Sequence, residues 1–242
     1  MRTVRIYQPG PYDKGHQVEL SATASQHVGV VLRMQVGDPL CVFCGDNREF
    51  KATIIAIQKK KVMVRIDDVA SVSRESPLSI HLAQGISKGD RMEWVIQKAV
   101  ELGVQQITPL MTTHCVVRLD ADRLNKKLAQ WQAIAIAAAE QSGRNQLTII
   151  HPACTLDAYL QDCNATTKRI LDPNATQSWR NHTDTKGDIA LIIGPEGGFS
   201  ETEVIRAQDF GFEPLSLGPR ILRTETAAIA ALSMIQGTNG DL

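Results

Sequence analysis

The chain has 242 residues with 26 basic and 26 acidic side chains, so its formal net charge is zero. Hydrophobic residues make up 43% of it, as in an ordinary globular protein, and no apolar run approaches the roughly 20 residues that span a membrane. The first residues, MRTVRIYQPG, lack the apolar core of a secretory signal. We therefore expect a cytoplasmic protein with no membrane partner.

Charge is unevenly distributed along the chain. Residues 1–72 hold ten Lys/Arg against seven Asp/Glu, whereas residues 73–242 hold sixteen against nineteen. A mildly basic first part can attract phosphate while the whole chain stays neutral. Charge alone therefore leaves RNA binding open.

The cysteines and histidines do not form a metal-binding pattern. Cys41 and Cys44 make a C-x-x-C, but they lie in an apolar, strand-like run and no second pair matches them. Structural zinc usually takes four ligands, and no H-x-x-x-H pair is present. We predict ordinary thiols and no metal.

Residues 1–72 are expected to form a small β-rich domain. Alternating apolar residues predict a hairpin around the run Lys59-Lys60-Lys61. A short helix is predicted over Ala24–Arg33, with Val28, Val31 and Leu32 on its apolar face. The predicted strands are Gln17–Leu20, Pro39–Cys44, Glu49–Ile57 and Lys61–Asp67.

From Leu78 onward the pattern changes to alternating strands and helices, which favours a parallel α/β sheet. A polar linker, Val69–Pro77, precedes this change. The strand Leu78–Gln84 leads to a helix capped by Asp90 and ended at Gly103. The residues of this helix predicted to face inward are Met92, Val95, Ile96, Ala99 and Val100.

The middle of the chain continues the alternation. The longest predicted helix, Asp120–Gln141, is alanine-rich over residues 133–139, which permits close packing either against a second subunit or onto the sheet. Residues 174–187 are polar and predicted to form a loop. The other predicted elements are strands Gln106–Met111, Thr148–Pro152 and Lys168–Asp172 and the helix Leu156–Gln161.

The stretch Ile189–Thr226 contains two strand–loop–helix units in tandem. The first loop, Gly194–Gly198, has the sequence GPEGG, and its glycines let backbone amides approach a ligand closely. Ser200 then caps a helix, with Glu203 as its reciprocal partner. The second loop follows Leu217. Two such loops at strand carboxyl ends are predicted to form one crevice, where open α/β sheets bind ligands.

Competing motifs are absent or incomplete. There is no G-x-x-x-x-G-K-[ST] phosphate loop and no G-x-G-x-x-G dinucleotide fingerprint. Gly85–Gly89 fits the G-x-S-x-G pattern of a hydrolase, with Ser87 as nucleophile and His114, His151 or His182 as partner. The alternative is a tight turn between strand and helix, and no histidine lies in a recognisable motif.

GPEGGFS followed by LGPRILRTETA resembles the carboxyl-terminal signature of the knotted (SPOUT) RNA methyltransferases. Within that class the chain is most similar to the bacterial 16S rRNA (uracil N3) methyltransferases. The similarity includes RIYQP, HVGVVLRM, QKAVELGV and RLNKKLAQWQAIAIAAAEQSGRN, and so extends over nearly the whole chain.

The resemblance implies a fold and a cofactor. It implies a SPOUT-type parallel sheet with a carboxyl-terminal trefoil knot at residues 73–242, and a PUA-like RNA-binding β-barrel at residues 1–72. The knot would hold S-adenosylmethionine, which leaves as S-adenosylhomocysteine, and no metal. Glu196 would bind the ribose or attract the sulfonium, or it would only brace its loop. The implied cofactor-binding residues are Gly194, Glu196, Gly197, Gly198, Leu217, Gly218, Ile221, Leu222 and Thr226.

Methylation of uracil N3 requires loss of a proton and spreads negative charge over O2 and O4. Arg223, Arg220 and Arg144 are the available cations, and in the knotted enzymes an arginine comparable to Arg144 often comes from the other subunit. Glu225 is the acidic candidate for proton removal. Two alternatives stay open: Arg223 and Glu225 only pair with each other or cap the last helix, and the proton leaves to water.

The implied partners are 16S rRNA in the small ribosomal subunit and a second copy of the chain, in a homodimer. Alternatives are methylation of another base or of a ribose 2′-OH in rRNA or tRNA, and a non-catalytic RNA-binding dimer. The candidate RNA contacts, each of which could equally be a solvated surface residue, are Arg2, Arg5, Tyr7, Arg33 and Arg48.

Overall fold

The computed structural model describes residues 3–59, 61–115, 120–179, 185 and 187–242. Arg2, Lys60, His182 and part of the loop predicted at 174–187 therefore lie outside the described residues. The chain divides into two compact units, which are described in turn: Met1–Glu75 with Ala139–Leu147, and Ser76–Ala138 with Thr148–Leu242. The functional domains expected at residues 1–72 and 73–242 stay a prediction.

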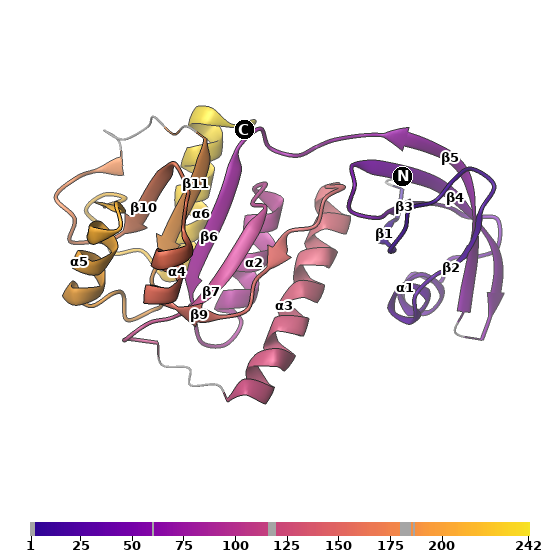
Figure 1. The fold of residues 1–242 in the computed structure, drawn as a ribbon. Coiled ribbons are helices and arrows are strands. Elements are labelled where there is room, and N and C mark those ends of the chain that lie inside the picture. Colours follow the sequence, from indigo (N-terminus) through magenta and orange to yellow (C-terminus); the bar gives the residue numbers. More distant parts are fainter. Residues whose placement is uncertain (1–2, 60, 116–119, 180–184, 186) are drawn as a thin grey trace. The chain divides into compact units, whose positions relative to one another are not determined.

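The first unit is built on a five-stranded sheet in the order β1-β3-β4-β5-β2 (Figure 1). Apolar residues alternate along its long strands, so Val62, Val64 and Ile66 all enter the core. The predicted hairpin is confirmed. The strands are β1 (Arg5–Tyr7), β2 (Gln17–Glu19), β3 (Pro39–Phe43), β4 (Arg48–Gln58) and β5 (Lys61–Ser71).

Strand β5 is longer than predicted. It continues through Ser71 because Val69, Ala70 and Ser71 pair with the start of β4. The prediction of a linker from Val69 is therefore wrong for its first residues.

The predicted helix Ala24–Arg33 forms as two short pieces. α1 (Ala22–Gln26) begins at Ser21, whose hydroxyl accepts the Ala24 N–H, and a π-helical turn, η1 (His27–Val31), follows. In this turn the Leu32 N–H donates to the His27 carbonyl, five residues back. Wider winding changes the direction of the side chains that follow. Val28 is buried as predicted, but Val31 is 66% exposed and Leu32 42%, so the expected apolar face is wrong for these two.

The second unit contains a parallel sheet in the order β12-β10-β11-β6-β7-β8, with β9 also paired to β7. Residues Ile189–Ile193 of β11 are all buried, as expected for a central strand covered on both faces. The predicted α/β alternation is confirmed. The strands are β6 (Ser79–Gly85), β7 (Gln106–Met111), β8 (Ile149–Ile150), β9 (Cys154–Thr155), β10 (Thr167–Leu171), β11 (Asp188–Ile193) and β12 (Glu213–Leu215).

Helices cover both faces of this sheet. α2 (Arg91–Glu101) packs against α6 (Thr224–Asn239), and α4 (Leu156–Asp162) and α5 (Glu201–Asp209) share a core with Ala190 and Ile192 on the other face (Figure 1). All five residues of α2 predicted to face inward are buried. α3 (Ala121–Ser142) begins in this unit, and its last turn belongs to the first unit. Within the described ranges, no helix is both long and apolar enough to cross a membrane. The trefoil knot stays a prediction.

Candidate functional site

A cavity of about 480 Å³ lies where β10, β11 and β12 end, at the carboxyl edge of the parallel sheet. Both predicted glycine loops line it, so the expectation that they form one crevice is confirmed. Its walls come from four short segments and from Arg91 of α2. The segments are Leu171–Asn174, Ile193–Phe199, Leu215–Gly218 and Arg220–Ala227. Within them, Ser216 and Thr226 do not line the cavity.

Glycine is needed in the first loop and at Gly85, the last residue of the neighbouring strand β6, which the backbone of the loop approaches closely. A Cβ on Gly85 would lie 2.4 Å from the Pro195 nitrogen, and Gly198 has a φ of +67°. The His114 Nδ1 lies 3.0 Å from the Gly197 carbonyl oxygen. At the end of the loop Ser200 and Glu203 form the predicted capping box, which begins α5. The loop is therefore held on two sides and starts a helix at a defined point.

The second loop turns at Gly218, whose φ of +117° suits glycine alone. A buried hydrogen-bond network joins this loop to the first. Thr224 Oγ1 donates to the Gly194 carbonyl at 2.6 Å and accepts from Gln84 Nε2 at 2.9 Å. Gln84 is wholly buried at the end of β6 and also reaches the Gly85 carbonyl at 3.2 Å. The network fixes the relative positions of the two loops.

Two carboxylates in the wall are joined by Arg91. Its Nη1 lies 2.6 Å from Glu196 Oε1, which also accepts the Lys88 N–H at 2.9 Å. Partial burial of Glu196 opposes ionisation, but its hydrogen bonds, from its own N–H, Lys88 and Arg91, lower its pKa. Arg91 Nε lies 3.9 Å from Glu225 Oε1, while Glu225 Oε2 is buried with no hydrogen-bond partner among the described residues.

Arg220 and Arg223 are exposed cations at the same cavity. Neither side chain makes a hydrogen bond or an ion pair with a residue that the structure describes. Arg223 occupies the N-cap position of α6 through its backbone, but its side chain makes no capping bond there. Glu225 pairs with Arg91 rather than Arg223. Both arginines are therefore available to a ligand that carries negative charge.

The cavity brings together ten of the twelve residues expected to bind the cofactor or act in catalysis. Thr226 is exposed at the start of α6 and does not line it, and Arg144 lies in the other unit. The assignment of all twelve to their roles stays a prediction. The ten lining residues are Gly194, Glu196, Gly197, Gly198, Leu217, Gly218, Ile221, Leu222, Arg223 and Glu225.

Sequence reasoning missed Arg91 as a lining residue. One local signal was present, because Arg91 is the first residue of α2, where a cation is unfavourable beside the positive end of the helix dipole. A residue that contradicts its local preference often has a functional reason. Asp172, just after β10, was also missed, although it too follows a strand at the carboxyl edge.

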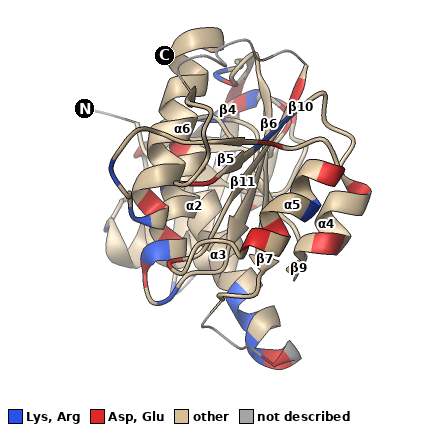
Figure 2. Ribbon diagram, turned by 90° about the vertical axis from the view of Figure 1, so that its left-hand side faces the viewer, with Lys and Arg blue, Asp and Glu red and all other residues tan. Residues whose placement is uncertain are grey.

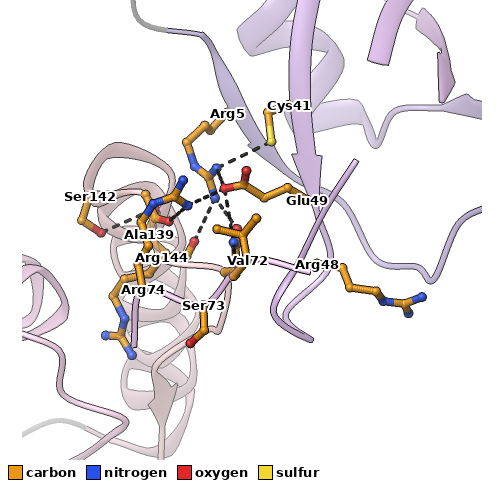
Figure 3. A network of polar contacts seen from close by, with 12 residues as sticks. Arg5, Cys41, Arg48, Glu49, Val72, Ser73, Arg74, Ala139, Ser142 and Arg144 are labelled. Carbon is orange, nitrogen blue, oxygen red and sulfur yellow. Dashed lines mark hydrogen bonds and ion pairs between the residues drawn. The ribbon is translucent and has the colours of Figure 1, made fainter. Parts of the chain in front are cut away.

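Arg144 is 3% exposed and belongs to a polar network of the first unit (Figure 3). Its Nη2 and Nε lie 2.6 and 2.8 Å from Glu75 Oε2. Nearby, Glu49 Oε1 accepts from both Arg5 and Arg74 at 2.5 Å, and Asn145 Nδ2 donates to the same oxygen at 3.2 Å. Burial opposes ionisation of Glu49, but these partners lower its pKa. The network accounts for the packing of Ala139–Leu147 with the first unit.

The candidate RNA contacts have different surroundings. Arg5 is paired with Glu49 and stacks 5.0 Å from the centre of the Phe43 ring, and the Tyr7 ring packs 5.7 Å from the same ring. Arg48 pairs with Asp46. Arg33 is exposed at a positive φ of 52°. RNA contact by any of them stays a prediction, but Arg5 is already engaged within its own unit.

The competing motifs have structural explanations. Ser87 is 5% exposed and its hydroxyl donates to the Gly85 carbonyl at 3.2 Å, as expected for a tight turn. Cys41 is buried in β3, where burial raises the pKa of its thiol. In the ranges that the structure describes, no cluster of three or more His, Cys, Asp or Glu side chains could hold a metal ion.

Figure 2 shows that acidic residues gather on α4 and α5. Of these two helices only α5 carries a basic residue, Arg206. A phosphate backbone is repelled by such a face, and we expect RNA to approach the second unit elsewhere. The acidic residues are Asp157, Asp162, Glu201, Glu203 and Asp209.

Comparison with known proteins gives matches over both units. A family model described as "RNA methyltransferase domain" matches residues 74–236, and one described as "RNA methyltransferase PUA domain" matches residues 20–67. A curated relative from Buchnera aphidicola (Schizaphis graminum), "Ribosomal RNA small subunit methyltransferase E", is 37% identical over 100% of this chain and 98% of its own length.

Two solved structures share the whole fold. A Legionella pneumophila protein solved in complex with the cofactor SAM is 54% identical, with a TM-score of 0.97 and full coverage of both chains. The ribosomal RNA small subunit methyltransferase E of Neisseria gonorrhoeae, bound to S-adenosyl methionine, is 36% identical, with a TM-score of 0.93 and full coverage of both chains. The fold and the site thus define an RNA methyltransferase with an amino-terminal PUA domain. The chain belongs to the ribosomal RNA small subunit methyltransferase E family, and the resemblance noted in the sequence is confirmed.

Proposed function

We propose that this chain is an S-adenosylmethionine-dependent methyltransferase acting on N3 of a specific uridine in 16S rRNA of the small ribosomal subunit. The observation that carries the proposal is the cavity between the two glycine loops. It lies in a chain that shares its whole fold with two structures holding this cofactor.

The cavity suits the cofactor in size and lining. Small-molecule sites usually enclose about 300–1,000 Å³, and this one encloses about 480 Å³. Leu217, Ile221 and Leu222 offer apolar surface for the adenine, and the Gly194–Gly198 loop offers backbone groups for the ribose and methionine parts. When bound, the cofactor supplies an electrophilic methyl group and leaves as S-adenosylhomocysteine.

The residues around the cavity suit the acceptor. The sulfur–carbon bond breaks as the N3–carbon bond forms, and the N3 proton must leave. Arg220 and Arg223 would stabilise the charge that spreads to uracil O2 and O4, because both are unpaired with respect to the described residues. Glu225, with one buried and unpartnered carboxylate oxygen, is the proton acceptor in this proposal. In-line displacement needs only correct positioning and no metal.

The proposal includes the assembly and the substrate. The enzyme would act as a homodimer on assembled small subunits in the cytoplasm, with the PUA domain at residues 1–72 binding RNA. A monomer in analytical ultracentrifugation at working concentration would contradict the dimer. The uridine would have to be unstacked for its N3 to enter the site.

The product test uses small subunits that lack methylation, incubated with the protein and labelled S-adenosylmethionine. Nuclease digestion and mass spectrometry of the nucleosides should reveal labelled 3-methyluridine. A label on ribose, or on another base, would refute the N3 assignment. RNA binding with no methyl transfer would instead indicate a non-catalytic RNA-binding dimer.

The donor test is calorimetric titration of S-adenosylmethionine. Ala227→Phe should abolish binding, because Ala227 lines the cavity from a regular helix and the larger ring fills it without altering loop backbone. Gly197→Val is less informative, since a Cβ there would lie 2.7 Å from the His114 Cβ and displace the loop. Thr238→Phe, exposed at the far end of the same helix, is the matched control. Binding that survives in Ala227→Phe would place the donor elsewhere.

A further inference from the structure

Arg91 has a position that the methyl-transfer chemistry leaves unexplained. It begins α2, yet its guanidinium contacts carboxylates on two other elements of the cavity wall. Nη1 lies 2.6 Å from Glu196 Oε1 in the first loop, and Nε lies 3.9 Å from Glu225 Oε1 at the start of α6. The Arg91 side chain is 38% exposed, and the two carboxylates are 24% and 18% exposed.

The Glu196 side chain does not depend on Arg91 alone for its position. Its Oε1 also accepts the Lys88 N–H at 2.9 Å. Loss of the Arg91 charge would therefore leave Glu196 anchored, while removing the positive charge between two carboxylates. The first effect of such a change would be electrostatic.

The charge of the wall matters because the two forms of the cofactor differ in charge. S-adenosylmethionine carries a positive sulfonium, whereas S-adenosylhomocysteine has a neutral sulfur. Glu196, Arg91 and Glu225 together carry one net negative charge, and without Arg91 they would carry two. A cation held in a cavity lined by these groups is attracted more strongly by two charges than by one, whereas the neutral product is nearly indifferent.

We propose that Arg91 is a specificity-determining residue that moderates the preference of this cavity for the sulfonium donor over the thioether product. By partly neutralising Glu196 and Glu225, it keeps donor and product affinities closer together. This inference rests on the proposed function, because it assumes that the cavity binds this cofactor.

The test compares the dissociation constants of both ligands by calorimetry in the full-length protein. Arg91→Gln keeps a hydrogen-bond donor near Glu196 but removes the charge. We expect the dissociation constant of S-adenosylhomocysteine, divided by that of S-adenosylmethionine, to rise on the order of fivefold. The increase should shrink in 1 M salt, which screens charge.

Three further variants separate charge from shape. Arg91→Lys restores a positive charge and should return the ratio toward the wild-type value, although lysine cannot bridge both carboxylates in the same way. Glu225→Gln should lower the ratio, because it removes one of the attracting charges. Lys98→Gln is the matched control, since Lys98 lies on the same helix and pairs with Glu101 outside the cavity, and it should leave both constants unchanged.

Equal weakening of both ligands in Arg91→Gln, with no change in the ratio, would overturn the inference and leave Arg91 as a structural brace. Failure of the wild-type protein to bind either ligand would instead refute the proposed function.

Discussion

Replacing Thr224 by valine should reveal how much the link between the two loops contributes to stability. Thr224 is 6% exposed, and its hydroxyl donates to the Gly194 carbonyl at 2.6 Å and accepts from Gln84 Nε2 at 2.9 Å. Valine has nearly the same shape, so the substitution removes the two hydrogen bonds and creates no cavity. Gln84 Nε2 and the Gly194 carbonyl each keep a hydrogen bond, because Gln84 Nε2 still reaches the Gly85 carbonyl at 3.2 Å and the Gly194 carbonyl at 3.4 Å.

The expected magnitude follows from these contacts. Each of the two lost hydrogen bonds contributes about 1 kcal/mol net, and the Gly194 carbonyl, left with only the 3.4 Å bond from Gln84 Nε2, adds a smaller penalty. We expect Thr224→Val to lower the free energy of unfolding by about 2–3 kcal/mol. For a chain of this size, that corresponds to a fall in Tm of roughly 5–10 °C.

The assay is urea denaturation followed by circular dichroism, with donor affinity measured in parallel. Thr224→Ser keeps the hydroxyl and is the control, expected to lie within about 1 kcal/mol of wild type. Donor affinity should fall in the valine variant, because the network joins one residue from each loop. A valine variant as stable as the wild type would show that the network contributes little and would refute the reasoning.

Three other substitutions test separate parts of the chain. Arg144→Gln should lower the free energy of unfolding by about 3 kcal/mol in the same assay, because it leaves the Glu75 carboxylate without its ion-pair partner. The Glu75 side chain is only 10% exposed. A variant as stable as the wild type would show that the pair is dispensable. Burial, and to a smaller extent the nearby His151, lowers the pKa of His81 from 6.5 to about 4. As the pH falls, this imidazole is therefore protonated in the unfolded chain before it is protonated in the folded protein. Protonation of His81 should therefore leave the free energy of unfolding unchanged above pH 6.5 and lower it by on the order of 3 kcal/mol toward pH 4. An equally steep fall in His81→Asn would contradict this origin. Arg223→Ala should reduce kcat on the order of a hundredfold while donor affinity changes less than about twofold, and unchanged methyl transfer would remove it from the catalytic assignment.

The parts of the fold that depend on short stretches of sequence were predictable. The inward face of α2 follows from apolar spacing within eleven residues, and all five predicted residues are buried. The capping box of α5 depends only on Ser200 and Glu203. The apolar run of β11 predicts a strand buried on both faces. In each case the residues that determine the structure are neighbours in the chain.

The errors and the elements that were not predicted involve partners that are distant in sequence or unusual backbone geometry. The parallel pairing of β1 with β3 joins Arg5 to Cys41, and nothing local predicts it. The extension of β5 to Ser71 depends on pairing with the start of β4. The π-helical turn at His27–Val31 alters the side-chain directions that a regular helix would give. Hydrophobic spacing alone does not contain this information.

The same distinction applies to the charged residues of the site. The sequence offers Arg144, Arg220 and Arg223 as the available cations, each close to a glycine-bearing break near a helix. The structure separates them by their partners: Arg144 is buried against Glu75, about seventy residues earlier, whereas Arg220 and Arg223 face the cavity with no bond to a described residue. An arginine whose charge is already neutralised has little left to stabilise an anionic transition state. Within a single chain we therefore expect the catalytic cation in the loop before α6, and a role for Arg144 would first require its release from Glu75.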